Sequence, residues 1–129
     1  MYSELIKKAE EARNNAYAPY SKFTVGAALL TKNDKIYTGC NIENASYGAT
    51  MCAERTALFT AVANGHRAFE AIAIVGGKGN EPDLPYPCGI CRQVLSEFCG
   101  RDFRVIVARS THDFEEHTLG SLLPYSFSL

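Results

Sequence analysis

The chain has 129 residues, 47% of them apolar, and its 13 basic and 14 acidic side chains give a formal net charge of -1. This length suits a single domain over residues 1–129 with one continuous hydrophobic core. The balanced charge argues against a nucleic-acid-binding protein, which would carry a surplus of basic residues. No apolar run approaches the length of a membrane span, and the acidic start of the chain does not fit a secretory signal.

The cysteine content indicates the cellular compartment. Five cysteines are an odd number, and the chain is longer than the small scaffolds held together by disulfides. Without an export signal, we expect a cytoplasmic protein in a reducing environment. There a cluster of cysteines indicates a metal site or catalysis more often than a disulfide.

The first half of the chain predicts a helix, a β-hairpin and a second helix. Apolar residues recur at helical spacing from Leu5 to Ala16, Ser3 is the expected N-cap, and Pro19 ends the helix. Alternation from Phe23 onward predicts a half-buried strand, which a polar turn connects to a returning strand. The expected elements are a helix over 3–16, strands over 23–30 and 36–42, and a helix over 51–63.

The second half alternates strands and helices. The short apolar run 71–75 is typical of a central strand that is covered on both faces. The segment 76–87 is rich in glycine and proline and reads as a long loop. A helix over 88–99, a buried strand over 103–108 and one or two helical turns over 118–123 follow. This order predicts an α/β fold with helices on both faces of one mixed sheet, in which strand 71–75 runs parallel to strand 104–108.

Two short motifs provide the residues for a metal site. Cys52 and Glu54 form a Cys-x-Glu motif, and Cys88 and Cys91 belong to a Pro-Cys-x-x-Cys motif. A catalytic zinc takes three protein ligands and leaves its fourth position for water. Both motifs precede helices, whose free N–H groups and dipole favour thiolates, and a spacing of three places Cys88 and Cys91 on one helix face. Arg55 can offset the negative charge by donating a hydrogen bond to a ligand sulfur.

Glu54 is the candidate for proton transfer. Bound zinc lowers the pKa of water to about 7, and Glu54 is close enough in sequence to Cys52 to lie beside that water. Zinc-dependent deaminases share this arrangement, including a glutamate that is not a metal ligand. In such a reaction the glutamate passes the proton of water to a ring nitrogen and then protonates the departing ammonia.

Three residues near the hairpin are candidates for holding a substrate. Asn41 and Glu43 have a spacing of two, so both side chains can point to one face. An amide beside a carboxylate suits sugar hydroxyls, and the carboxylate would repel a phosphate, which favours a nucleoside over a nucleotide. Phe23, at the start of the neighbouring strand, can stack on a base.

Other interpretations of the cysteines exist. Cys88 and Cys91 alone would also fit a thioredoxin-type redox pair, although such pairs closely follow a strand. A structural zinc site would need a fourth ligand, for which Cys40 and Cys99 are the candidates. Either cysteine would otherwise be a small buried hydrophobic residue.

Five stretches, in order, resemble the small homotetrameric cytidine deaminases and span nearly the whole chain. They are Ser21–Leu29, Thr38–Gly48, Cys52–Ala57, Pro87–Leu95 and Leu122–Phe127. The resemblance implies a three-layer α-β-α sandwich around a mixed five-stranded sheet. It also implies a homotetramer that shares its sites between subunits, with one Zn²⁺ per subunit.

The resemblance assigns a role to each matching residue. Cys52, Cys88 and Cys91 would bind zinc, and Glu54 would shuttle protons. Phe23 would pack on the pyrimidine, Asn41 and Glu43 would hold the ribose 3′-hydroxyl, and the backbone of Ala53 would contact the base. Ala45, Tyr47 and Phe127 match positions that approach the site of a neighbouring subunit.

The resemblance implies hydrolytic deamination of cytidine and 2′-deoxycytidine in pyrimidine salvage, with no nucleic-acid or membrane partner. A related deaminase of the blasticidin-S type shares the cysteine motifs, but we do not expect it to keep Asn41, Glu43 and Asn44. An RNA or DNA cytosine deaminase is disfavoured by the missing basic surplus. A non-enzymatic domain stabilised by a closed zinc site is the alternative from a different functional class.

Overall fold

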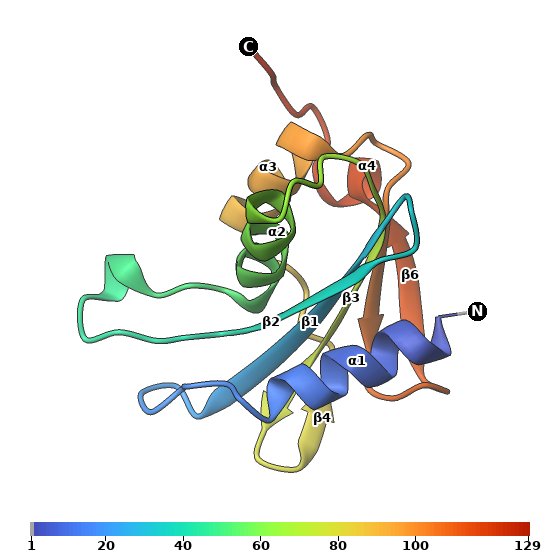
Figure 1. Ribbon diagram of the computed structural model, residues 1–129. Helices are drawn as coiled ribbons and strands as arrows, with labels where there is room; N and C mark the ends of the chain where they lie inside the picture. The colour runs from blue at the N-terminus through green and yellow to red at the C-terminus, as the bar shows by residue number, and fades with distance from the viewer. Residues whose placement is uncertain (1) are drawn as a thin grey trace.

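A computed structural model describes residues 2–129 (Figure 1). Four α-helices and six strands lie in these residues, together with the short 3₁₀ helix η1 (Tyr47–Ala49). The helices are α1 (Ser3–Arg13), α2 (Ala53–Ala63), α3 (Gly89–Phe98) and α4 (Leu119–Leu122). The strands are β1 (Phe23–Thr31), β2 (Ile36–Cys40), β3 (Phe69–Lys78), β4 (Glu81–Asp83), β5 (Arg104–Ala108) and β6 (Phe114–Thr118).

The strands form one mixed sheet in the order β2-β1-β3-β5-β6, and β4 pairs with β3 beside this path. The path therefore has the five strands expected from the family, and β4 adds a sixth. The β1–β2 hairpin is antiparallel, as predicted, with Leu30 opposite Ile36. β3 and β5 run parallel, with Ile72 opposite Val105, and the chain that connects them contains α3. Their apolar sequences suit this central position because both faces of the two strands are covered.

Helices cover both faces of the sheet, so the three-layer prediction is confirmed (Figure 1). Alternating residues of each strand point to opposite faces. Ala27 and Leu29 of β1 pack in the core on the side of α2, whereas Ala28 belongs to the core beneath α1. The apolar stripe of α1 is also as predicted, and its buried residues are Leu5, Ile6, Ala9 and Ala12.

Several boundaries differ from the sequence prediction. Ser3 is the first residue of α1 and makes no capping hydrogen bond, and the helix ends at Arg13, before Ala16. The segment 76–87 is not one loop, because β3 continues to Lys78 and turns back into β4. Gly79 makes this turn possible, since its φ of 56° lies in the left-handed region. The edge strand β6 was not predicted, because its sequence is polar and only partly buried.

Candidate metal centre and substrate cleft

The two cysteine motifs meet at the starts of α2 and α3. Cys52 is the N-cap residue of α2 and Cys88 that of α3, one position earlier than the first-turn placement that the sequence suggested. Cys91 lies in the first turn of α3, and its backbone N–H donates to Cys88 Sγ at 3.4 Å. The three cysteines thus lie at the N-termini of two helices, where unpaired backbone N–H groups favour negative charge.

The sulfur atoms of Cys52, Cys88 and Cys91 all lie within 4.8 Å of one another. Within the described residues 2–129, these three cysteines are the group that could hold a metal ion. The Cys52 and Cys88 sulfurs are 3.7 Å apart. Cys40 and Cys99 stay outside this group, so a closed four-cysteine site is not formed. Three convergent thiols with one position left over fit a catalytic zinc.

Arg55 offsets the negative charge of the cysteine cluster. Its Nη2 donates to Cys52 Sγ at 3.4 Å. This contact with a thiolate raises the pKa of Arg55. Hydrogen bonding from Cys91 lowers the pKa of Cys52 to about 5, and the same interaction raises the pKa of Cys91. In the described part of the chain, Arg55 Nε is a buried polar atom without a partner. A partly buried guanidinium that donates to a ligand sulfur suits a site whose thiols are deprotonated together by a metal.

Glu54 is the second residue of α2, directly after Ala53, and is only 5% exposed. Burial raises the pKa of its carboxyl to about 7, and the negative charge of Cys52 adds to this effect. A buried carboxyl whose pKa lies near neutrality can both accept and donate a proton at physiological pH.

A cavity of about 270 Å³ opens beside the cluster. It brings together several predicted residues, namely Phe23, Asn41, Cys52, Ala53, Glu54 and Cys88. Pro85 and Tyr86 also line it and were not predicted, because they belong to the segment read as a loop. A larger hollow of about 450 Å³ lies between α1 and the β3–β4 hairpin, but Cys52 and Cys88 line the cavity of about 270 Å³ and not the larger hollow.

Asn41 is fixed by the backbone of β1. The N–H of Val25 donates to Asn41 Oδ1 at 2.9 Å, and Asn41 Nδ2 donates to the carbonyl oxygen of Phe23 at 2.8 Å. The amide therefore holds the start of β1, including Phe23, in place. It keeps one lone pair and one N–H for a ligand, because an amide oxygen accepts twice and an NH₂ group donates twice.

Glu43 is not among the residues that line the cavity. Its Oε1 accepts hydrogen bonds from the N–H groups of Tyr20 and Ser21, at 2.9 and 3.1 Å. The hydrogen bond with the Ser21 hydroxyl, together with these backbone contacts, holds the pKa of Glu43 below its usual value. The carboxylate is thus oriented by the backbone, with its second oxygen still available.

The remaining predicted residues lie apart from the cavity of this chain. Ala45 and Tyr47 belong to the segment 42–51, which projects from the body together with η1 (Figure 1). Phe127 lies in the C-terminal segment, which also runs away from the sheet (Figure 1). Tyr47 is 78% exposed and Phe127 is 70% exposed.

Arg92 is a site residue that the sequence analysis missed. Its Nε donates to the carbonyl oxygen of Pro87 at 2.7 Å, and its Nη1 donates to the carbonyl oxygen of Leu122 at 2.7 Å. It therefore ties the residue before Cys88 to the end of α4. Its position directly after Cys91 was the available signal, since residues next to metal ligands often orient them.

Comparison with known proteins agrees with this geometry. A family model described as "Cytidine and deoxycytidylate deaminase zinc-binding region" matches residues 1–108. A cytidine deaminase of Sporosarcina psychrophila is 50% identical over 97% of this chain and 90% of its own length. A crystal structure of cytidine deaminase from Burkholderia pseudomallei superposes with a TM-score of 0.90 and 47% identity, covering 98% of this chain and 99% of that one.

A blasticidin-S deaminase of Bacillus cereus is more distant, with 30% identity over 97% of this chain and 91% of its own length. No helix in residues 2–129 is both long enough and apolar enough to cross a membrane.

The family model covers most of the chain, and the three-thiol cluster, the buried glutamate and the fold all agree with it. The chain therefore belongs to the cytidine and deoxycytidylate deaminase family, whose members share this zinc-binding region.

Proposed function

We propose that the protein is a zinc-dependent hydrolase that converts cytidine and 2′-deoxycytidine to uridine and 2′-deoxyuridine, with release of ammonia. One observation carries the proposal. The buried carboxyl of Glu54 lies in the same cavity as Cys52 and Cys88, at the start of a helix. A proton carrier and a metal group in one cleft are what hydrolytic deamination requires.

Cys52, Cys88 and Cys91 would hold one Zn²⁺ per subunit. When bound, the metal supplies a Lewis acid that makes water a nucleophile near neutral pH. Glu54 takes a proton from the attacking water and delivers it to the ring nitrogen next to the amino-bearing carbon. It then takes the second proton of that water from the new hydroxyl group on the carbon, which becomes the carbonyl, and delivers it to the departing amino group. One water is thus consumed and one ammonia is released. The pKa of about 7 for Glu54 suits both steps.

The nucleoside would be held by residues from three parts of the chain. Phe23 supplies an aromatic face for the pyrimidine, and the backbone of Ala53 contacts the base. Asn41 and Glu43 hold the ribose 3′-hydroxyl with the donor and acceptor capacity that their backbone hydrogen bonds leave free. The carboxylate of Glu43 would repel the negative charge of a 5′-phosphate, which disfavours a nucleotide. We expect no discrimination at the 2′-hydroxyl.

We infer a homotetramer that shares sites between subunits. Ala45, Tyr47 and Phe127 belong to projecting segments and would complete the cleft of a neighbouring copy. Their exposure and their absence from the cavity of their own chain support this assembly. Sedimentation of the zinc-loaded protein should give four times the mass of the chain, and a monomer would contradict the shared-site arrangement.

The proposed setting is pyrimidine salvage in the cytoplasm. All five cysteines are free, and Cys88 is exposed. Free thiols at a metal site suit a reducing compartment, because an oxidising one would convert such thiols to disulfides. The near-neutral net charge gives no electrostatic basis for binding a polynucleotide.

The experiment that tests this function follows the ultraviolet absorbance of cytidine, CMP and cytosine in turn with the zinc-loaded protein, with ammonia measured in parallel. Loss of the cytidine signal with ammonia release, and little change with CMP or cytosine, is the expected result. Turnover of CMP equal to that of cytidine would contradict the role of Glu43. No turnover of any of the three would contradict the proposed activity and favour a deaminase for a modified pyrimidine.

A further inference from the structure

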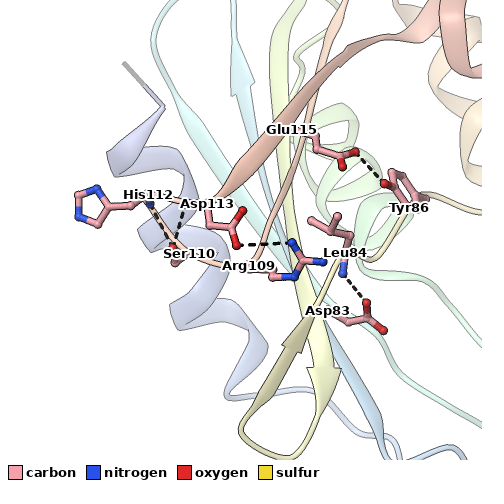
Figure 2. A network of polar contacts seen from close by, with 8 residues as sticks. All are labelled: Asp83, Leu84, Tyr86, Arg109, Ser110, His112, Asp113 and Glu115. Atoms are coloured by element: carbon pink, nitrogen blue, oxygen red, sulfur yellow. Dashed lines mark hydrogen bonds and ion pairs between the residues drawn. The ribbon is translucent and has the colours of Figure 1, made fainter.

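The wall of the cleft beside Cys88 is tied to a distant strand. Tyr86 lies two residues before Cys88, and it lines the same cavity as Phe23 and Glu54. Its hydroxyl donates a hydrogen bond to Glu115 Oε1 at 2.7 Å (Figure 2). Glu115 belongs to β6, the edge strand of the sheet, and lies opposite Val107 of β5. The edge strand is thereby connected to the cleft.

A second contact restrains the same tyrosine. His117 Nε2 lies 2.9 Å from Glu115 Oε1, so the two partners share one carboxylate oxygen. The rings of Tyr86 and His117 also meet edge to face, with their centroids 5.9 Å apart and an interplanar angle of 72°. The hydrogen bond from Tyr86 holds the pKa of Glu115 below its usual value. The carboxylate is therefore ionised at neutral pH, and an ionised acceptor makes the stronger hydrogen bond.

The hydrogen bond matters because Tyr86 is not held in place by burial. The residue is 47% exposed, so its ring could turn into solvent through an ordinary rotamer change if the hydroxyl lost its partner. The backbone next to Cys88 does not depend on this contact, because Arg92 holds the carbonyl oxygen of Pro87 at 2.7 Å. Glu115 therefore acts on the side chain that forms the wall and not on the metal ligand.

We propose that Glu115 is a positioning residue, which fixes the ring of Tyr86 as a wall of the nucleoside cleft and thereby sets how tightly cytidine is held. This inference rests on the proposed function. Because Glu115 touches neither the thiol cluster nor Glu54, its contribution is the same in the ground state and the transition state. An interaction of that kind changes KM and leaves kcat unaltered.

The test compares Glu115→Ala, Glu115→Gln and Glu116→Ala. In Glu115→Ala the KM for cytidine should rise about threefold to tenfold, the range expected from the net loss of one hydrogen bond, while kcat and zinc content stay the same. Glu115→Gln keeps an oxygen that accepts from Tyr86 and should restore most of the wild-type KM. An unchanged KM in Glu115→Ala, or a fall in kcat alone, would overturn the proposal.

Glu116→Ala is the matched control. Glu116 is the next residue of β6 and is similarly exposed, and it pairs with Arg104 at 3.0 Å on the other face of the strand. Its loss removes a carboxylate and an ion pair from the same strand without touching Tyr86, so its KM should equal that of the unaltered protein. An equal rise in KM in both alanine variants would mean that only the integrity of β6 matters, which contradicts the proposal.

A second readout separates this inference from the proposed function. The seven tyrosines can be replaced by 3-fluorotyrosine during expression. The ¹⁹F resonance of Tyr86 is then the one that is missing from the spectrum of Tyr86→Phe. At neutral pH this resonance should move when uridine is added. Without ligand it should move in Glu115→Ala and not in Glu116→Ala. Normal cytidine turnover with no response of Tyr86 to uridine would overturn the inference alone. A shift of the Tyr86 resonance on addition of uridine, without any turnover of cytidine, would contradict the proposed activity but not the role of Glu115 in positioning Tyr86.

Discussion

Arg92 donates a 2.7 Å hydrogen bond from its Nε to the carbonyl oxygen of Pro87, the residue immediately before Cys88. The same guanidinium reaches the carbonyl oxygen of Leu122 at the end of α4. One side chain therefore holds the backbone that presents a candidate zinc ligand, and it does so from the helix that carries Cys91.

Replacing Arg92 with alanine should weaken zinc retention, because Cys88 would no longer be held in its metal-binding position. Loss of a group that orients a metal ligand typically lowers affinity by about 10- to 100-fold. The measurement is transfer of zinc from the protein to a coloured chelator. Arg101→Ala is the control, since Arg101 also donates to a backbone carbonyl near α4, that of Gly120, away from the cysteines. Equal zinc transfer from both variants would contradict the role of Arg92.

Cys88→Ser should sharply reduce the zinc content of the purified protein, because a serine hydroxyl is a poor substitute for a thiolate ligand. Cys40→Ser should keep its zinc, because Cys40 lies outside the metal-binding group of residues 2–129. Elemental analysis of the two variants measures the difference. Full zinc occupancy in Cys88→Ser would show that the three-thiol assignment is wrong.

The hydrogen bonds to Glu43 predict a pH dependence of stability. Bonding to Ser21 and Tyr20 lowers the pKa of Glu43 in the folded protein below its ordinary value of 4.5. The stabilisation is therefore complete above that ordinary value, and it is lost as the pH falls through the lower folded pKa. At pH values above 4.5, unaltered protein should be more stable than Glu43→Gln.

This difference should shrink on acidification below the ordinary pKa of Glu43. Urea unfolding of both proteins at neutral pH and at several acidic pH values measures it, and comparing the pair cancels effects of acid on the metal site that both share. A difference that grows as the pH falls would contradict the assigned hydrogen bonds.

The parts of the site that depend on local sequence were predictable. Cys-x-Glu and Pro-Cys-x-x-Cys each lie at a helix start, and helix geometry alone places Cys88 and Cys91 on one face. The alternation in β1 and the apolar run within β3 likewise gave the strands that position Phe23 and the core. The two helices begin later than predicted, at Ala53 and Gly89, and Cys52 and Cys88 occupy the N-cap positions instead of the first turns.

The parts that depend on distant contacts were not predictable. β6 carries two adjacent glutamates and forms only by pairing with β5, so no apolar pattern marks it. Gly76, Gly77 and Pro82 suggested a loop, although β3 and β4 pair through these residues. Tyr86 and Glu115 are 29 positions apart in the sequence, and no spacing rule relates two residues that meet only after the sheet has formed.

The mechanism depends on Glu54 as the proton carrier, and the decisive measurement is turnover by Glu54→Gln. Zinc-loaded Glu54→Gln and unaltered protein are compared by the absorbance change of cytidine, with zinc content and thermal unfolding measured on the same samples. We expect the variant to retain metal and fold while turnover falls by at least about 10²- to 10⁴-fold, the usual contribution of a positioned proton-transfer group. Near-normal turnover in the variant would contradict the role of Glu54 and with it the mechanism.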